Sequence, residues 1–387
     1  MTQSSLLTKM RSRGMGWFLA RLLQESQNRA SIIGKTIKPF MMILFWGLIL
    51  PMNKLKAISS LSPKVSLLDT LYLFYDLDVS PVTYDFSWAL VLAEQERKRR
   101  NLASVTVVFV PGKKQGLREE DPGYEAEINY FSRLWRRHEM LYAMCHLLPS
   151  CAGVTLCQSR EQANVLCESA RPNLFPKQYN EIFPITHETS QVLQHKTSDI
   201  MALRSTLQAL KYMDQWLAPR LKQRKLITIT LRQSSYMPAR NSNISAWAEF
   251  ARSLNPREFF VVFIADTDSA LEGIPAELAE FVFFNEACWN LNLRSALYER
   301  SYLNLGVNNG PMALCWLNAN CRYITFKLFT PDVPQASLAA YKRHGIDIGK
   351  SLPFSTDFQT WAWEEDQLNV ITRKFGEIQR IMEVAWK

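Results

Sequence analysis

The strongest constraint on the fold is an alternation of strand-like and helix-like segments that begins near residue 70. An apolar run at 70–77 is followed by helical apolar spacing at 83–100, and a second apolar run at 104–112 is closed by Pro111 and Gly112. A strand, a helix and a strand in this order predict a β-α-β unit. Such units carry parallel strands, so the pattern predicts a parallel sheet.

The alternation stops and then restarts, which predicts two α/β halves. The first half continues with a helix at about 124–148, a strand at 153–158 and a helix at 159–169, before an irregular, proline-bearing stretch at 170–200 and a helix at about 201–222. Strand signals resume at 226–232, 258–268, 302–307 and 321–326, with helical spacing between them. We expect domains at 65–222 and 223–350, an arm at 1–64 and a helical tail at 351–387.

The net charge of +9 is concentrated in the arm. Residues 1–60 hold nine lysines and arginines and one acid, Glu25, so the rest of the chain is close to neutral and the charge does not predict a nucleic-acid partner. The arm also contains an apolar run at 39–52, which is short for a membrane span of roughly 20 residues. It fits a segment lying on an anionic membrane surface, or a helical arm packed on the protein body.

The cysteines indicate a reducing compartment. The seven cysteines form an odd number, most lie in apolar segments, and none forms a C-x-x-C motif. Buried thiols and no metal site are therefore expected. Because no cleavage pattern follows the apolar run, a cleaved signal peptide is not expected. The predicted location is the cytoplasm, with peripheral attachment to the inner face of the membrane as an option.

Several well-known catalytic motifs are absent. The sequence has no G-x-G-x-x-G after the first strand of either half, no G-x-x-x-x-G-K-[ST], no G-x-S-x-G and no H-E-x-x-H. Dehydrogenase, P-loop nucleotidase, hydrolase and zinc-peptidase activities are therefore disfavoured.

The stretch LNLGVNNGPMALCW, residues 303–316, is a candidate phosphate site. The strand should end near Val307, leaving Asn308 and Asn309 in the turn, and Pro311 suits the first position of a helix. A helix start beside the carboxyl end of a strand offers free N–H groups, and Gly310 would let a ligand approach the backbone. An ordinary strand-to-helix turn has the same residue types, so spacing alone leaves both interpretations open.

A second candidate is the polar loop after the strand at 226–232. Arg232 ends that strand and Arg240 precedes the next helix, and guanidinium groups bind phosphate oxygens in a bidentate manner. Asn241 and Asn243 would cap the helix or donate to a ligand, and Asp266 ends the next strand. A solvated loop is the alternative interpretation.

Carboxylates near the end of the first strand are the candidate catalytic bases. Asp78 is the leading one and Asp85 the second, with ordinary loop solvation and helix capping as the alternatives. Asp76 with Asp78, and Asp266 with Asp268, also form weak D-x-D metal-binding patterns.

Three aromatic side chains could also contact a ligand. They are His187, in the irregular stretch between the halves, and Trp361 and Trp363 near the C-terminus. Structural packing is the more frequent role for such residues.

Taken together, these features resemble the GT-B glycosyltransferases. The stretch GVNNGPMALCWLNA, 306–319, is similar to the strand, turn and helix of heptosyltransferase-like enzymes, and Arg232 with its loop is similar to the phosphate-binding segment of fucosyltransferase-like enzymes. The resemblance implies two Rossmann-like domains facing each other across a cleft. In this chain Asn309 and Ala313 replace an acidic residue and a histidine of the heptosyltransferase pattern.

The resemblance further implies transfer of a sugar from a nucleotide-sugar to a glycan or lipid-linked acceptor, with inversion and without a metal. Asn309, Gly310, Pro311 and Met312 would cradle the diphosphate, Arg232 would pair with its charge, and no cofactor other than the nucleotide-sugar is expected. The alternatives are a non-catalytic Rossmann-like ligand-binding or scaffold protein at a membrane surface, and a nucleotide-sugar epimerase.

Overall fold

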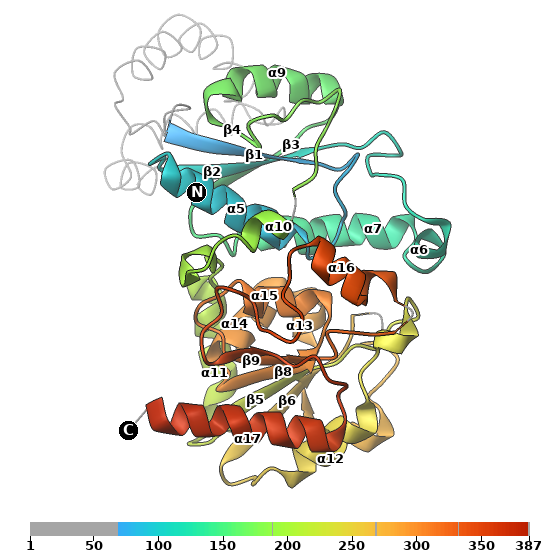
Figure 1. Cartoon of the computed structure of the whole chain (residues 1–387), viewed down its shortest axis with the longest axis vertical. Helices are drawn as coiled ribbons and strands as arrows, with labels where there is room; N and C mark the ends of the chain where they lie inside the picture. Colours follow the sequence, from blue (N-terminus) through green and yellow to red (C-terminus); the bar gives the residue numbers. More distant parts are fainter. Residues whose placement is uncertain (1–68, 188, 268, 332, 386–387) are drawn as a thin grey trace, which may run out of the picture. The chain divides into compact units, whose positions relative to one another are not determined.

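Two parallel β-sheets organise the chain (Figure 1). The first has the order β3-β2-β1-β4 and consists of β1 (Thr70–Asp76), β2 (Ser104–Val110), β3 (Cys151–Leu156) and β4 (Leu174–Phe175). The second has the order β10-β9-β8-β5-β6-β7 and consists of β5 (Lys225–Thr230), β6 (Phe259–Ile264), β7 (Val282–Phe283), β8 (Leu303–Val307), β9 (Tyr323–Phe326) and β10 (Gln359–Trp361). Neighbouring strands pair in parallel throughout. The predicted α/β class with two parallel sheets is confirmed.

This is a computed structural model, and it describes residues 69–187, 189–267, 269–331 and 333–385. These residues belong to one compact unit, Leu67–Lys387. The expected arm at 1–64 lies outside the described residues, and so does Asp268.

Helices connect the strands. The α-helices are α5 (Phe86–Arg99), α6 (Pro122–Glu127), α7 (Tyr130–Arg136), α8 (Ala143–Cys145), α9 (Arg160–Ala170), α10 (Thr189–Val192), α11 (Leu207–Leu221), α12 (Ile244–Ser253), α13 (Glu286–Trp289), α14 (Leu291–Arg300), α15 (Ala313–Trp316), α16 (Leu338–Arg343) and α17 (Leu368–Ala385). A π-helix, η3 (Arg137–Tyr142), and the 3-10 turns η4 (Arg171–Asn173), η5 (Ser198–Ile200), η6 (Pro238–Arg240), η7 (Ala276–Leu278), η8 (Gly310–Met312) and η9 (Pro334–Ala336) complete the elements. None of the helices in the described ranges is both long and apolar enough to span a membrane.

The strand order of the second sheet determines where a ligand can bind. Strands β6 and β7 lie on one side of β5, whereas β8, β9 and β10 follow on the other side. The chain therefore reverses direction across the sheet between β5 and β8. In open α/β sheets, ligands bind in the crevice at the carboxyl ends of the two strands at such a switch point. Those two ends lead into the loop 231–243 and into the turn at Asn308.

The segment at 351–387 is more than a helical tail. Its β10 pairs with β9 and forms an edge of the second sheet. Its α17 packs against α12, where Phe375 lies edge-on to Phe250 with ring centroids 5.3 Å apart. Just before α17, the buried Asp366 carboxylate accepts hydrogen bonds from Asn243 N (2.7 Å) and Trp247 Nε1 (2.9 Å) at the start of α12. This segment therefore completes the second half.

The long helix expected at 124–148 is divided. Helix α6 ends at Glu127, and the Asn129 side chain caps α7 by accepting from Ser132 N at 3.0 Å. The chain then widens into the π-helix η3 before α8. Such π-helical turns are frequent at functional sites because they re-aim side chains without ending the helix.

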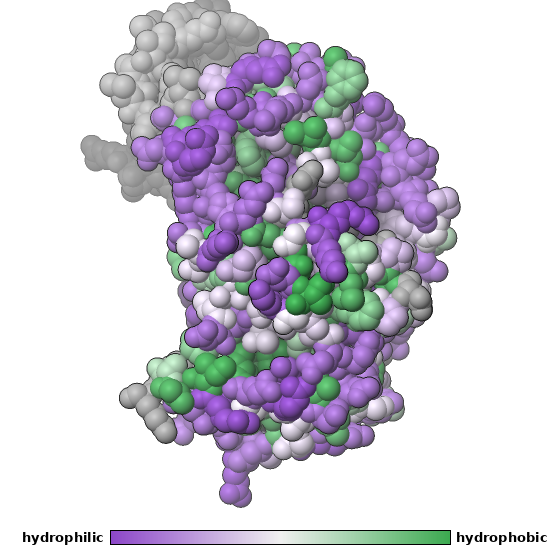
Figure 2. Space-filling view, in the orientation of Figure 1, coloured by the Kyte–Doolittle hydropathy of each residue, from purple (hydrophilic) through white to green (hydrophobic). Residues whose placement is uncertain are grey.

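Polar side chains cover most of the face seen in Figure 2. An apolar group lies at the C-terminal end of α17, where 44% of Ile381 and 75% of Val384 are exposed. The main hydrophobic core, by contrast, includes residues of both sheets, and Trp88 of α5 lies 6.2 Å from Trp316 of α15 between ring centroids. The two halves therefore share part of their core.

Candidate functional site

A cavity of about 870 Å³ lies at the carboxyl ends of the strands, with walls from both halves. From the first half it is lined by Pro81, Thr83, Tyr84, Asp85 and Trp88, and by residues of 118–140 that include Arg118, Glu120, Asp121, Tyr124, Phe131, Trp135, Arg136 and Glu139. From the second half it is lined by Arg232, Ser234, Tyr236, Arg240, Asp266, Thr267, Trp289, Arg294, Asn308, Asn309, Gly310, Pro311, Tyr341, His344 and Trp361, among others. Its position is that expected for a ligand at the β5–β8 switch point.

The turn after β8 lines the cavity with residues 308–311. Asn309 is the N-cap and its Oδ1 accepts from Met312 N at 3.2 Å. Asn308 Nδ2 donates to the Tyr341 hydroxyl at 2.8 Å, which fixes the turn against α16. Met312 differs from the expectation, since it is fully buried and does not line the cavity. Its side chain belongs to the core, with only its backbone N–H serving the turn.

The space in front of Gly310 is filled by Tyr84. A Cβ atom added at Gly310 would lie 2.6 Å from Tyr84 Cδ2 and 3.2 Å from Tyr84 Cγ. The glycine was expected to make room for a ligand, but in this structure it makes room for a ring of the first half. Burial raises the pKa of the Tyr84 hydroxyl, and the charges of Arg294 and Arg136 oppose this shift.

The loop after β5 is organised by Arg232. The buried guanidinium donates to Met237 O at 3.0 Å, to Asn241 Oδ1 and to the Tyr236 carbonyl. Asn241 also accepts from Ser234 N at 3.1 Å, so its side chain holds the loop together. Asn243 caps α12 by accepting from Ala246 N at 3.2 Å. Arg232 lines the cavity, whereas Asn241 and Asn243 lie outside its lining and make loop and helix-cap contacts, the first of the two roles expected for them.

Arg240 joins the two candidate segments. Its Nη2 donates to Asn308 O at 2.8 Å, which links the loop after β5 to the turn after β8. Burial lowers the pKa of this guanidinium, and the nearby Asp85 carboxylate is among the groups that oppose the shift. Arginine nevertheless stays charged in proteins. Arg240 therefore presents a positive charge at the switch point.

Arg294 of α14 is a further arginine of this wall, and it was not predicted. The side chain is 1% exposed, with Nε donating to Ala287 O at 2.8 Å and Nη1 to the Tyr298 hydroxyl at 3.2 Å. Within the described ranges, neither Arg294 nor Arg240 forms an ion pair with a carboxylate. Arg294 has the helical spacing of an ordinary surface arginine, so the sequence alone does not distinguish it.

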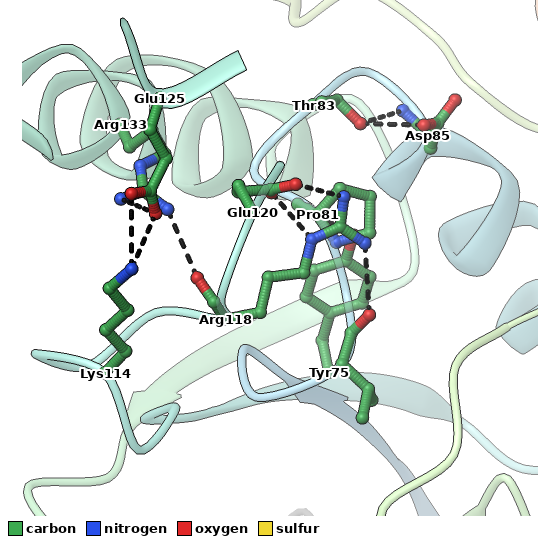
Figure 3. A network of polar contacts seen from close by, with 10 residues as sticks. Tyr75, Pro81, Thr83, Asp85, Lys114, Arg118, Glu120, Glu125 and Arg133 are labelled. Atoms are coloured by element: carbon green, nitrogen blue, oxygen red, sulfur yellow. Dashed lines mark hydrogen bonds and ion pairs between the residues drawn. The ribbon is translucent and has the colours of Figure 1, made fainter. Parts of the chain in front are cut away.

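Asp85 lines the cavity, but Asp78 does not. Asp78 instead accepts from Lys113 N at 2.8 Å and pairs with Lys113 Nζ at 3.0 Å. Burial alone would raise the pKa of the Asp78 carboxyl, but the hydrogen bonds and charge of Lys113 hold that pKa below its usual value. Asp85 is exposed, and Thr83 Oγ1 donates to its Oδ2 at 2.8 Å (Figure 3). Of the two predicted bases, Asp85 is therefore the one that lines the cavity.

The remaining predicted carboxylates have different environments. Asp76 is buried and forms a bidentate pair with Arg160, with N···O distances of 3.0 and 2.9 Å, and it also accepts from the Tyr179 hydroxyl at 2.7 Å. It therefore braces the first sheet. Asp266 lines the cavity, and its Oδ2 accepts from Gln233 N at 3.0 Å. In the described part of the chain, no group of His, Cys, Asp and Glu side chains is arranged to hold a metal ion.

His187 and Trp363 lie outside the cavity lining. His187 Nε2 donates to Phe74 O at 3.3 Å, its ring stacks on Tyr75, and burial lowers the pKa of His187 to about 4. Trp363 Nε1 donates to Lys350 O at 2.9 Å. Trp361 lines the cavity as part of an aromatic wall, with its ring centroid 5.1 Å from that of Trp316.

The charges that line the cavity are segregated by half. Among the described residues, the first-half wall has four carboxylates (Asp85, Glu120, Asp121, Glu139) and two arginines (Arg118, Arg136). The second-half wall has three arginines (Arg232, Arg240, Arg294) and one carboxylate (Asp266). The second half is therefore suited to an anionic group, and the first half offers carboxylates that can accept protons.

Solved glycosyltransferases are among the structures to which this chain is similar. The ADP-heptose lipopolysaccharide heptosyltransferase II of E. coli matches with 12% identity and a TM-score of 0.45, over 81% of this chain and 99% of that chain. A family 9 glycosyltransferase from Veillonella parvula matches with 12% identity and a TM-score of 0.39, over 67% of this chain and 80% of that chain. The α-1,6-fucosyltransferase NodZ, in a crystal soaked with GDP-fucose, matches with 10% identity and a TM-score of 0.33, over 67% of this chain and 95% of that chain. No protein-family model and no curated protein matches the sequence.

Proposed function

We propose that the protein transfers a sugar from a nucleotide-sugar donor to a hydroxyl group of a glycan or lipid-linked acceptor. The observation that carries this proposal is the segregation of charge in one cavity at the β5–β8 switch point. A nucleotide-sugar presents a diphosphate, which needs positive charge, beside an anomeric carbon whose attacking hydroxyl must lose a proton. The arginines of one wall and the carboxylates of the other supply these two functions.

The donor diphosphate binds against Arg240 and Arg294 in this proposal. Arg294 is buried and Arg240 is half-buried, and the hydrogen bonds described above go to neutral oxygens, so their charge is available to an anion. A charged hydrogen bond is stronger in a site that excludes water. Asn308 and Asn309 contribute the adjoining turn, and Arg232 holds the shape of the loop that carries Arg240.

Asp85 acts as the general base. It accepts the proton of the acceptor hydroxyl while that oxygen bonds to the anomeric carbon and the bond from this carbon to the phosphate oxygen breaks. The departing nucleoside diphosphate keeps the electron pair, and Arg240 and Arg294 stabilise its added charge without reorganising. A single displacement of this kind inverts the configuration at the anomeric carbon.

Donor binding and turnover test this proposal separately. The purified full chain is screened by thermal shift against GDP-, UDP-, ADP- and CMP-linked sugars, and release of the nucleotide is then followed with candidate acceptors. Asp85→Asn should keep donor binding and lose turnover by about a hundredfold or more, the usual share of a general base. Asp78→Asn, a neighbouring carboxylate outside the cavity lining, is the matched control and should stay active. The absence of a shift with every donor would refute the proposal, and an active Asp85→Asn enzyme would refute the role of the base.

A further inference from the structure

The loop that carries Asp85 is held in place by side chains of other segments. It connects β1 to α5 and spans residues 77–85. From β1, the Tyr75 hydroxyl donates to Pro81 O at 2.7 Å (Figure 3). Within the loop, Thr83 Oγ1 donates to Asp85 Oδ2 and accepts from Asp85 N at 3.3 Å. These contacts fix the last part of the loop directly before α5.

Arg118 makes the contact that fixes the first part of the loop. Its Nε and Nη2 donate to the two carboxylate oxygens of Glu120 at 2.6 and 2.9 Å, as Figure 3 shows. Its Nη1 donates to Val79 O at 3.2 Å. A bidentate pair fixes the plane of a guanidinium, so the third nitrogen is aimed at one carbonyl group. Glu120 therefore directs Arg118 towards the loop.

The segment that carries Arg118 and Glu120 is itself anchored. Arg133 of α7, which is 5% exposed, donates from Nη1 to Arg118 O at 3.2 Å and from Nη2 to Glu125 Oε1 at 3.2 Å. Lys114 Nζ donates to the same carboxylate at 3.1 Å. This network connects α6 and α7 to the residues that face the loop, as seen in Figure 3. The segment from which Arg118 contacts Val79 is therefore itself held in place by α6 and α7.

We propose that Arg118 is a positioning residue that holds Asp85 at the cavity through Val79. The inference rests on the proposed function, in which Asp85 is the general base. A carboxylate that must meet an acceptor hydroxyl at hydrogen-bond distance loses rate when its backbone shifts by about 1 Å. Arg118 also lines the cavity, so direct contact with the acceptor is the competing role. The two roles affect different quantities, since positioning changes kcat and contact changes the acceptor KM.

The first test measures the loop without any substrate. Hydrogen–deuterium exchange is followed in peptides covering residues 77–87 of the full chain and of Arg118→Gln. We expect about tenfold faster exchange in the variant, the size that corresponds to loss of one charge-assisted hydrogen bond. Arg99→Gln is the matched control, because Arg99 forms the same bidentate pair with Glu96, at 2.6 and 2.8 Å, outside the cavity lining. Equal exchange in the wild type and Arg118→Gln would overturn the inference whatever the activity is.

The second test uses turnover. Arg118→Lys keeps the charge but lacks the planar fork, so we expect kcat to fall about tenfold in both Arg118→Lys and Arg118→Gln, with donor affinity and acceptor KM unchanged. Rescue by lysine, or a rise confined to the acceptor KM, would overturn the positioning role. Glu120→Gln keeps Arg118 but weakens the bidentate pair that orients its guanidinium, so kcat should fall by a smaller factor. This variant replaces the Arg118 variants in the test if they do not fold. A wild type that binds no donor would contradict the proposed function, while the exchange result would still decide whether Arg118 braces the loop.

Discussion

The ring of Tyr84 lies directly against the backbone of Gly310, at the point where a Cβ would come within 2.6 Å of Tyr84 Cδ2. Tyr84 precedes Asp85 on the first half, and Gly310 lies in the turn after β8 on the second. The contact therefore sets the spacing between the proposed base and the proposed donor turn. It also explains why a residue without a side chain is required at position 310.

We expect Gly310→Ala to lower the free energy of unfolding by about 1–3 kcal/mol, the usual cost of forcing atoms into a filled space. Because the clash is with one ring, Tyr84→Ala should remove most of this penalty in the double variant. Urea unfolding of the four proteins measures the coupling. Gly376→Ala, at an open position in α17, is the control and should be neutral or slightly stabilising. Additive effects of the two substitutions at 84 and 310 would contradict the contact.

Arg294→Met should weaken donor binding by about tenfold or more, because a buried charge that binds the diphosphate is replaced by an apolar chain of similar length. Stability without donor should change little, since burying an unpaired charge is itself unfavourable. Isothermal titration with the responding nucleotide-sugar gives the affinity. Arg300→Met, on the same helix but paired with the Asp214 carboxylate, serves as the control. Equal affinities for the two variants would show that Arg294 is not part of the donor site.

His187 should make stability depend on pH below neutrality. Burial lowers the pKa of His187 to about 4 in the folded chain, from 6.5 for an ordinary histidine. Between these two pH values His187 is protonated in the unfolded chain but neutral in the folded chain. The free energy of unfolding therefore falls as pH drops from 6.5 towards 4, by up to about 3 kcal/mol. Above pH 6.5 this contribution is constant. Denaturant unfolding of the wild type and His187→Gln at pH 7.0, 6.0 and 5.0 isolates the effect, and parallel profiles would contradict it.

The basic arm gives a prediction that is independent of the cavity. If residues 1–60 lie on an anionic membrane surface, the full chain should sediment with phosphatidylglycerol vesicles at low salt and be released as the salt concentration rises. Deletion of residues 1–60 should abolish this binding, and vesicles of phosphatidylcholine alone should bind neither protein. Retention of the truncated chain on the anionic vesicles would assign the binding to another surface.

The sequence predicted the central strands because their burial is visible in it. All seven residues of β1 are buried, as expected for a parallel strand covered on both faces, and the apolar run at 70–77 has that pattern. Strands β4, β7 and β10 have two or three residues, too few to show a period. Such short strands form because a neighbouring strand is already in place, which is information from other parts of the chain.

The candidate site was predicted less completely, for a similar reason. Asp78 and Asp85 look equivalent in the sequence, and what separates them is Lys113, which follows β2 and occupies the Asp78 carboxylate. Arg294 has the spacing of an ordinary helix residue until the packing of α14 encloses it. The turn residues Asn308 to Pro311 were recognisable because turn chemistry is local. Roles that depend on a partner more than thirty residues away could not be read from the sequence.

The strand order also has a consequence for synthesis of the chain. The first sheet is complete once Phe175 has emerged, whereas β5 needs β8 as its neighbour, and the part of α12 that packs on α17 is covered only when Leu368–Ala385 follow. The ribosome delivers residues in order, and domains generally form as units during translation. Part of the apolar face of α12 in the second half is therefore covered only after α17 has been made. Nascent chains stalled before residue 368 should accordingly be strong targets for chaperones that recognise apolar surface.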